Sequence, residues 1–145
     1  MLSIAVVNGP NLNLLGTRET EIYGNVPFET YMEGLQQRYP GISFSYYQSN
    51  VEGELVNYLH GCRAQVTGII FNGAGYTHTS VALADAIAAI NIPVIEVHIS
   101  NIYTREEFRK TSLTASKCVG CITGLGLMGY ELALQYFINS GTKTS

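Results

Sequence analysis

The chain has 145 residues, of which 46% are hydrophobic and only 13% are charged, and its formal net charge is −3. This length fits one compact domain, which we expect over residues 1–140, followed by a frayed tail over residues 141–145. Eight Lys and Arg residues without a basic run argue against nucleic-acid binding, and the lack of a signal-peptide pattern or of about 18 consecutive apolar residues predicts a cytoplasmic protein with no membrane contact.

Five β-rich segments alternate with helical patterns along the chain. Residues 4–7 and 69–71 are apolar at consecutive positions, which is typical of strands that are covered on both faces. The predicted strands are residues 2–8, 42–49, 68–72, 94–99 and 118–123.

The segments between these strands carry apolar residues at helical spacing. Most of them place these residues on one stripe. Residues 80–90 differ, because they are almost all Ala, Val, Leu and Ile and predict a helix that is buried nearly all round. The predicted helices are residues 28–39, 51–64, 80–90, 105–110 (short and charged) and 129–139.

Strict alternation of strands and helices predicts parallel strands with right-handed crossovers and helices on both faces of the sheet. We therefore expect an α/β, flavodoxin-like fold with a five-stranded parallel sheet of order 2-1-3-4-5. The charged fraction is about half of the usual ~25%, which suggests that copies of the chain bury surface against one another in a homo-oligomer.

The three cysteines are too few for a disulfide scaffold and favour a reducing compartment. Cys118 and Cys121 form a C-x-x-C pattern, but a structural zinc site needs two further ligands, and none lies near them in sequence. We interpret both as buried strand residues, and we predict no metal and no organic cofactor.

Polar side chains collect where three of the predicted strands end, which is where open α/β sheets bind ligands. The first strand leads into Asn8-Gly9-Pro10-Asn11, the third ends at Asn72 and is followed by His78, and the fourth contains Glu96 and His98. Histidine occurs only three times in the chain. Because two of these three histidines, His78 and His98, fall at predicted strand ends, we expect a functional site at this edge of the sheet.

Two further features add candidates. Residues 11–25 form the longest irregular stretch, which is typical of an active-site lid and contains Arg18 and Tyr23. Asp85, the sole aspartate, lies in an apolar helical pattern and needs a partner, a ligand or an interface. It follows His78 by seven residues, which predicts that the two share a helical face. Taken singly, each of these residues is more often a surface or packing residue.

A G-x-G-x-x-G pattern at residues 124–129 matches the dinucleotide-binding fingerprint in its letters. Such a site also needs another strand with an acidic residue about 20 positions further on, which this sequence does not contain. Close packing of the last strand against the last helix explains these glycines better.

Four motifs, taken in their order and spacing, go beyond these single residues. They are Asn8-Gly9-Pro10-Asn11-Leu12; Gly16-Thr17-Arg18-Glu19 with Ile22-Tyr23-Gly24; residues 76–83 with Asp85; and residues 96–101 with residues 105–109. Over residues 2–137 the chain thereby resembles the type II 3-dehydroquinate dehydratases (type II dehydroquinases). The resemblance implies a hydro-lyase of the shikimate pathway for aromatic amino-acid biosynthesis, which converts 3-dehydroquinate to 3-dehydroshikimate by anti elimination of water through an enolate.

The resemblance also implies roles for individual residues. Its catalytic set is Tyr23 as general base, Arg18 beside it, His98 as general acid and Asn11 holding a water that stabilises the enolate. Its substrate-binding set is Asn72 with the backbone amides of Ile99 and Ser100 for the carboxylate, and His78, Arg109 and Asp85 for the ring hydroxyls. It further implies a dodecamer built as a tetramer of trimers, in which Asp85 reaches into the site of a neighbouring subunit.

The chemistry of these roles is consistent with the residue types. A free phenol titrates near ~10, so only about 0.1% is ionised at pH 7. An arginine within about 4–6 Å lowers that pKa by about 1–3 units and does not lose its own proton. A dry site with a fixed donor stabilises the enolate, and an imidazole suits proton donation to a departing hydroxyl.

Three alternatives compete with this interpretation. A Schiff-base route to the same product is disfavoured because Lys110, Lys117 and Lys143 do not follow apolar strand ends. A flavodoxin-like nucleotide- or flavin-binding protein would need a phosphate cradle after the first strand, where Pro10 lacks an N–H. A catalytically inactive scaffold would not need Arg18, which is intact along with the other proposed catalytic groups.

The sequence departs from the family pattern at three places. These are Thr20, where a proline is usual, and residues 73–75 and 113–117. None of the departures removes a proposed catalytic group.

Overall fold

The computed structural model describes residues 2–17 and 26–141. Its strands form one five-stranded parallel sheet in the order β2-β1-β3-β4-β5, so the predicted topology is confirmed. The strands are β1 (Ser3–Asn8), β2 (Ser43–Gln48), β3 (Gly68–Asn72), β4 (Val94–His98) and β5 (Gly120–Thr123). The α-helices are α2 (Phe28–Arg38), α3 (Glu52–Gly61), α4 (Val81–Ile90) and α5 (Met128–Gly141). Residues 142–145 of the expected tail lie outside the described residues.

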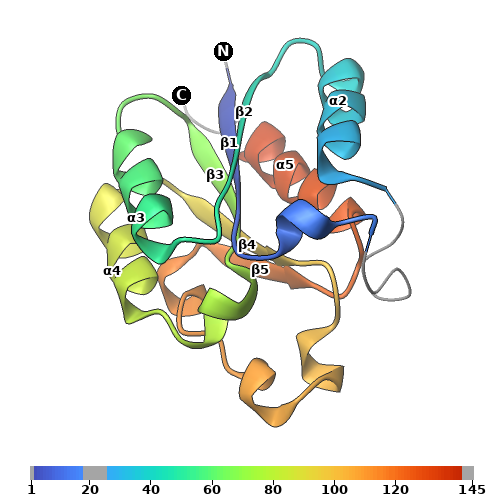
Figure 1. Ribbon diagram of the computed structural model, residues 1–145. Coiled ribbons are helices and arrows are strands. Elements are labelled where there is room, and N and C mark those ends of the chain that lie inside the picture. Colours follow the sequence, from blue (N-terminus) through green and yellow to red (C-terminus); the bar gives the residue numbers. More distant parts are fainter. Residues whose placement is uncertain (1, 18–25, 142–145) are drawn as a thin grey trace.

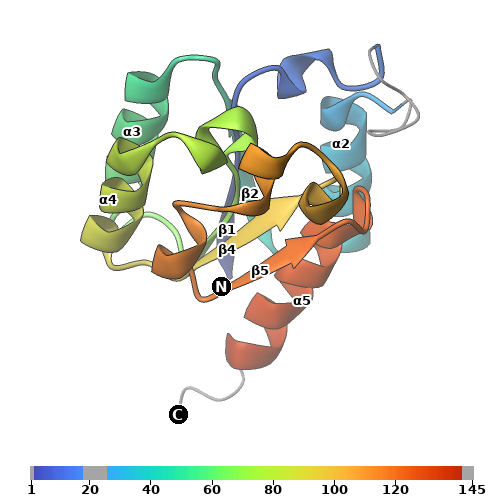
Figure 2. The same cartoon turned by 90° about the horizontal axis from the view of Figure 1, so that it is seen from below.

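Helices cover the sheet on both faces, with α2 and α5 on one side and α3 and α4 on the other (Figures 1 and 2). All residues of β3 and β4 are buried, because both strands lie inside the sheet and have helices above and below. This placement explains the consecutive apolar residues of β3. No helix in the described part of the chain is long and apolar enough to cross a membrane.

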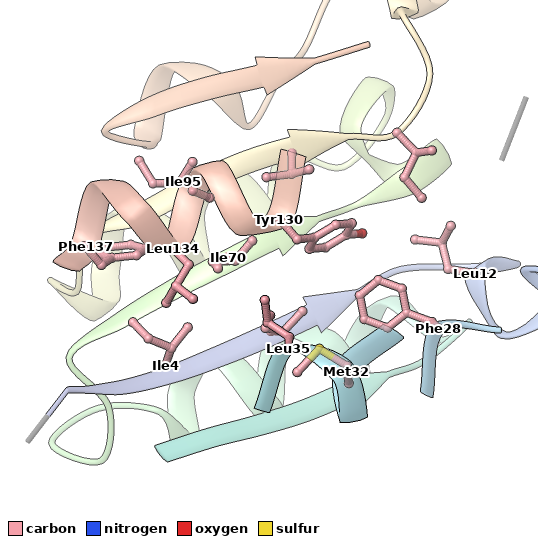
Figure 3. Packing of buried hydrophobic residues seen from close by; sticks show 14 of the residues in the cluster. Ile4, Leu12, Phe28, Met32, Leu35, Ile70, Ile95, Tyr130, Leu134 and Phe137 are labelled. Carbon is pink, nitrogen blue, oxygen red and sulfur yellow. The ribbon is translucent and has the colours of Figure 1, made fainter. Parts of the chain in front are cut away.

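Each face of the sheet has its own core. Ile4 and Ile70 point toward α2 and α5 (Figure 3), and Val6 belongs to the same cluster. Ala5 and Ile69, one residue away along the strands, pack with α3 and α4 instead. Because strand side chains alternate between faces, two separate apolar clusters pack against the sheet from opposite sides. This packing holds in place the end of the sheet at which the polar residues follow the strands.

The helix α4 is not buried nearly all round, contrary to the sequence-based prediction. Val81 is 62% exposed, and Ala82, Asp85 and the pair at positions 88–89 are also exposed. The helix packs against the sheet with one stripe, and the opposite stripe, which is apolar apart from Asp85, faces outward because no other described segment covers it. Composition alone does not distinguish a buried stripe from an outward one.

The prediction that His78 and Asp85 share a helical face is also wrong. His78 closes a short 3-10 helix (Ala74–His78), and α4 begins only at Val81. Ser80 separates the two elements, because its Oγ accepts a hydrogen bond of 2.9 Å from the backbone N–H of Leu83 and so caps α4. The charged helix expected at residues 105–110 is likewise a 3-10 helix, Glu107–Lys110.

The C-x-x-C pair was predicted to be buried, and this is wrong. Cys118 is only partly buried and precedes β5, and Cys121 is exposed. Among the described strands β5 pairs with β4 alone, so it forms one edge of the sheet. An apolar run at an open sheet edge looks the same in sequence as one in the interior.

The glycines at 124–129 serve packing and backbone geometry. Gly124 has a φ of +88°, which L side chains rarely adopt, and a Cβ there would lie 3.0 Å from the Cβ of Asn101. A Cβ at Gly129 would lie 3.1 Å from Cγ1 of Val97 on β4. The close approach of α5 to the sheet therefore accounts for Gly129, as predicted from the sequence, whereas positive φ angles account for Gly124 and Gly126.

Candidate active site

The segments that follow β1, β3 and β4 meet at one end of the sheet (Figure 1). They enclose a pocket whose lining combines amides, imidazoles and guanidinium groups with a few apolar side chains. The lining residues are Pro10, Asn11, Leu12, Leu15, Asn72, Ala74, Gly75, His78, His98, Ile99, Ser100, Ile102, Arg105 and Arg109. Loops at strand ends thus bring together residues from distant parts of the sequence.

The floor of the pocket depends on a close backbone contact. The N–H of Gly9 donates a 2.7 Å hydrogen bond to the carbonyl of Asn72. A Cβ at Gly9 would lie only 2.5 Å from the carbonyl oxygen of Gly73, so no larger residue fits there. This contact fixes the spacing between the loops after β1 and β3. Asn11 then turns in the left-handed region, with a φ of 70°, and its N–H bonds to Oδ1 of Asn50 at 2.9 Å.

His98 is held by a buried carboxylate. Its Nε2 lies 2.8 Å from Oε2 of Glu96, and the two residues are 4% and 0% exposed. A carboxylate only accepts hydrogen bonds, so this contact places the proton of a neutral imidazole on Nε2. The other ring nitrogen, Nδ1, is the one left for a ligand.

Glu96 remains ionised despite its burial. Burial alone raises the pKa of this carboxyl, but hydrogen bonds from His98, Thr114 and Ser112 outweigh that effect and hold the pKa below its usual range. Ser112 donates from Oγ to Oε2 at 2.9 Å, and Thr114 donates to Oε1. The thiol of Cys121 adds a longer contact of 3.6 Å to Oε2. The negative charge beside His98 is therefore well stabilised.

His78 is anchored differently. Its Nδ1 lies 2.8 Å from the backbone carbonyl of Thr111, and because a carbonyl oxygen accepts, Nδ1 carries the proton and leaves Nε2 for a ligand. Its ring centroid is 6.3 Å from that of His98, with an interplanar angle of 22°. Two imidazoles with different partners thus lie side by side in the pocket.

Two arginines line the pocket, and both lie near the carboxylate of Glu106, whose Oε1 is 3.9 Å from Nε of Arg105 and 3.0 Å from Nε of Arg109. Arg105 donates from Nη1 to Oγ of Ser100 at 3.3 Å, and Arg109 donates from Nε to Oε1 of Glu106 at 3.0 Å. Their side chains are 19% and 25% exposed. Guanidinium groups favour carboxylates and vicinal oxygens. The pocket is therefore suited to a small oxygen-rich anion, although the chain as a whole has a net charge of −3.

Comparisons with known proteins agree with this geometry. The family profile "Dehydroquinase class II" matches residues 2–138. The chain belongs to the type II dehydroquinase family. A 3-dehydroquinate dehydratase from Campylobacter lari is 50% identical over 136 residues, which cover 92% of this chain and 85% of that protein. A 3-dehydroquinate dehydratase from Fusobacterium nucleatum is 50% identical over 148 residues, and the match covers 98% of this chain and 100% of that protein.

Solved structures show the same relationship. The crystal structure of the type II dehydroquinase from Butyrivibrio crossotus superposes with a TM-score of 0.89 at 42% identity, covering 93% of this chain and 96% of that one. The type II dehydroquinase from Propionibacterium acnes gives a TM-score of 0.89 at 40% identity, covering 94% and 96%. The resemblance noted in the sequence is confirmed, and the alternative of a flavodoxin-like nucleotide or flavin binder is not favoured.

Most of the site residues expected for a type II dehydroquinase converge in the pocket. Those that line it are Asn11, Asn72, His78, His98, Ile99, Ser100 and Arg109. Asp85 does not line the pocket; it lies on the outward stripe of α4. Arg18 and Tyr23 fall outside the described residues, as does most of the expected lid.

Sequence reasoning did not assign a role to three residues that the structure places at or beneath the pocket: Glu96, Arg105 and Tyr130. For Glu96 a signal was available, because residues i and i+2 of a strand share one face and Glu96 precedes His98 by two. Tyr130 had no such signal. It comes from α5, far along the chain, and reaches Asn72 only through the tertiary packing of that helix.

Among the described residues, one group of side chains has the composition of a metal site. Ligand atoms of Glu96, His98 and Cys121 lie within 4.8 Å of one another, because Cys121 is the register partner of Glu96 on β5. These atoms already bond to each other, so they form a hydrogen-bonded cluster. Lys110 and Lys117 are exposed and do not line the pocket, and Lys143 lies outside the described residues.

Proposed function

We propose that this protein eliminates water from 3-dehydroquinate to give 3-dehydroshikimate, in the shikimate pathway, by general acid–base catalysis without a metal or organic cofactor. Membership in the type II dehydroquinase family supports the reaction. The observation that carries the proposal in this chain is the buried Glu96–His98 pair at the wall of a cationic pocket. Such a pair is suited to deliver a proton to a hydroxyl group that leaves as water.

His98 is the proposed general acid. With Nε2–H bound to the ionised Glu96, a second proton on Nδ1 produces an imidazolium whose charge the carboxylate stabilises. Transfer of the Nδ1 proton to the departing hydroxyl breaks the C–O bond and releases water. The imidazole returns to its neutral form with the Nε2 proton still in place. One proton from solvent then restores the imidazolium by binding to Nδ1.

The proposed general base is Tyr23, with Arg18 keeping the phenol ionised. Both roles rest on the family motifs, because both residues lie outside the described part of the chain. The tyrosinate removes the C2 proton, and the electrons move to the neighbouring carbonyl oxygen to form the enolate. A water held by Asn11 stabilises that oxygen, and proton donation by His98 then completes the elimination.

The remaining lining residues bind the substrate. Asn72 and the backbone N–H groups of Ile99 and Ser100 are proposed to hold its carboxylate, at the ends of β3 and β4. His78 and Arg109 are proposed to bind the ring hydroxyls. Arg105 lines the same pocket and adds positive charge near the carboxylate.

We also infer a homo-oligomer, built as a dodecamer of four trimers, in a cytoplasmic enzyme. The outward stripe of α4 supports this, since Val81 and its alanine neighbours leave an apolar surface around Asp85. In the trimer Asp85 is proposed to reach the pocket of a neighbouring subunit. Light scattering tests the assembly: Ala88→Arg is expected to produce smaller species, and a wild-type protein that is monomeric contradicts the inference.

An absorbance assay for the conjugated enone product, on addition of 3-dehydroquinate, tests the reaction. Tyr23→Phe is expected to abolish turnover while the substrate still binds, and Tyr103→Phe, at a residue 57% exposed outside the pocket, is the matched control with normal activity. Borohydride with substrate is expected to leave the enzyme active, because no imine forms. A Tyr23→Phe variant with near-normal kcat contradicts the mechanism, and wild-type protein without turnover contradicts the function.

A further inference from the structure

We propose that Tyr130 is a positioning residue for the substrate carboxylate, and that its hydroxyl fixes the direction in which Asn72 offers its amide N–H to the pocket. The inference rests on the proposed function, in which Asn72 binds the carboxylate. Tyr130 does not line the pocket itself. It acts from beneath, through a chain of buried hydrogen bonds that joins α5 to the ends of β1 and β3.

Tyr130 is placed where its ring cannot turn. It is completely buried at the start of α5, and its hydroxyl points toward the carboxyl ends of the strands (Figure 3). Its ring packs edge-on against Phe28, with centroids 4.8 Å apart, and lies 6.2 Å from the ring of Tyr31. Close packing of this kind limits the ring to one rotamer. The hydroxyl oxygen therefore has a fixed position.

That oxygen lies between two asparagines. Asn72 donates from Nδ2 to the Tyr130 hydroxyl at 2.9 Å, and the hydroxyl in turn donates to Oδ1 of Asn8 at 2.7 Å. Asn8 and Asn72 are register partners on β1 and β3, so the sheet places both amides beside the ring. The Nδ2 of Asn8 donates to the hydroxyl of Tyr46 at 3.4 Å. Each hydrogen bond in this chain therefore fixes the direction of the next.

The direction matters because an asparagine amide has a donor end and an acceptor end. Oδ1 of Asn72 accepts from the backbone N–H of Ala74 at 3.0 Å, and Nδ2 is held by Tyr130. One Nδ2 hydrogen is used in the bond to Tyr130, and the second is left for a ligand. Rotation of the amide by 180° would instead present a carbonyl oxygen to an anion, which is repulsive. Tyr130 and Ala74 together exclude that rotamer.

The network is also neutral. Burial raises the pKa of the Tyr130 hydroxyl well above that of a free phenol, so it stays protonated and donates to Asn8. No charged side chain is among its hydrogen-bond partners in the described part of the chain. A neutral network presents fixed dipoles to the carboxylate without supplying or accepting protons. Its loss is therefore expected to weaken substrate binding rather than the chemical step.

Tyr130→Phe tests this, because it keeps the ring and removes only the hydroxyl. We expect KM for 3-dehydroquinate to rise about tenfold, with kcat within about threefold of wild type, since a buried amide hydrogen loses its acceptor. Tyr31→Phe is the matched control. Its hydroxyl is buried and has no hydrogen-bond partner among the described residues, and its removal is expected to change neither constant more than about twofold.

A second readout isolates the carboxylate. Quinate and its methyl ester are compared as competitive ligands of the wild type and of Tyr130→Phe, and only quinate is expected to lose affinity. In an Asn72→Ala background, the effect of Tyr130→Phe on KM is expected to disappear, because the hydroxyl acts through Asn72. A structural defect in Tyr130→Phe would instead lower kcat and weaken both ligands.

The outcomes separate the two proposals. If wild-type protein turns over 3-dehydroquinate but Tyr130→Phe leaves KM unchanged, or lowers kcat with KM constant, the positioning role is wrong and the proposed function stands. If wild-type protein has no turnover, the proposed function fails. Should Tyr130→Phe not fold, Asn8→Val replaces it. This variant removes the acceptor that orients the hydroxyl and is expected to raise KM in the same way.

Discussion

Two buried polar clusters lie at the same end of the sheet and differ in kind. The first surrounds Glu96 and His98 at the β4–β5 edge and carries a negative charge. The second joins Tyr130 to Asn8 and Asn72 at the centre of the sheet and is neutral. The charged cluster holds an ionised carboxylate against an imidazole, whereas the neutral cluster consists of fixed hydrogen-bond donors and acceptors.

The location of each cluster suits its chemistry. Glu96 is surrounded by donors from a loop and from the edge strand, where Cys121 is exposed, and a buried charge requires such donors. The neutral cluster lies under α5 against the aromatic core, where an unpaired charge could not be tolerated. We therefore expect the two clusters to affect different kinetic constants. The Glu96–His98 cluster should control kcat, and the cluster of Tyr130 with the two asparagines should control KM.

The largest expected effect comes from removing the charge at the edge. Glu96→Gln keeps the size of the side chain but leaves a doubly protonated His98 without its carboxylate. We expect kcat to fall about 100-fold while KM changes less than about threefold, measured by enone formation. This is the reverse of the result expected for Tyr130→Phe.

The control for that variant is Glu107→Gln, which removes an exposed carboxylate paired with Lys110 at 3.0 Å. Exposed pairs of this kind contribute little, so both kinetic constants are expected to stay within about twofold of wild type. If Glu96→Gln raised KM and left kcat unchanged, the division between the two clusters would be incorrect.

The clusters are also expected to respond to opposite ends of the pH scale. The pKa of Glu96 is lowered in the folded protein, so its contribution to the free energy of unfolding is present above about pH 5 and is lost as the pH falls below about 4. The pKa of Tyr130 is raised by burial, so its contribution is present below about pH 9 and is lost as the pH rises above about 10.

Both contributions are measured by denaturant unfolding at a series of pH values, which gives the dependence of the free energy of unfolding on pH. Glu96→Gln is expected to flatten the acid side of the profile, and Tyr130→Phe is expected to flatten the alkaline side and leave the acid side unchanged. Glu96→Gln also changes the alkaline side to a smaller extent, because burial and then the Glu96 charge raise the pKa values of the Cys118 and Cys121 thiols. Part of each slope remains in the variants, because Glu131 and Tyr31 also have shifted pKa values. Identical pH profiles for the two variants would show that the clusters are not separate titrating units.

The smallest effect is expected at Cys121. Its thiol lies 3.6 Å from the Glu96 carboxylate, a longer contact than those of the hydroxyl donors. Cys121→Val removes this weak donor and suits an edge strand, so we expect kcat within about twofold and a loss of stability below about 1 kcal/mol. A larger loss of kcat would place the thiol among the groups that support His98.

The sequence predicted the parts of the structure that depend on local patterns. Consecutive apolar residues identified β3 with its observed ends, Gly68–Asn72, and strand-end polar residues located the pocket. Apolar runs did not distinguish an interior strand from an edge strand, so Cys121 was placed in the interior. Nor did they distinguish the packed stripe of α4 from its outward stripe, because apart from Asp85 both consist of apolar residues.

The parts of the site that escaped prediction depend on contacts between distant elements. Glu96 receives its donors from Ser112 and Thr114, of which Thr114 lies in residues 113–117, a stretch that departs from the family pattern. Serine and threonine are common loop residues, so nothing in the sequence marks these two as donors to Glu96. Tyr130 is one of ten tyrosines and stands out only when α5 is docked against β1 and β3. Pairings of this kind arise from tertiary packing and leave no periodic signal.

The hydrogen bond between Tyr130 and Asn8 spans 122 positions of the sequence. During synthesis, β1, β3 and β4 emerge from the ribosome before α5 has been made. The nascent sheet therefore exposes two asparagine amides with no hydroxyl between them, and the anion site lacks its support until the last described helix docks. Closing so long a loop is entropically costly and slow. The hydrogen bond that orients Asn72 therefore forms only when α5 docks against β1 and β3.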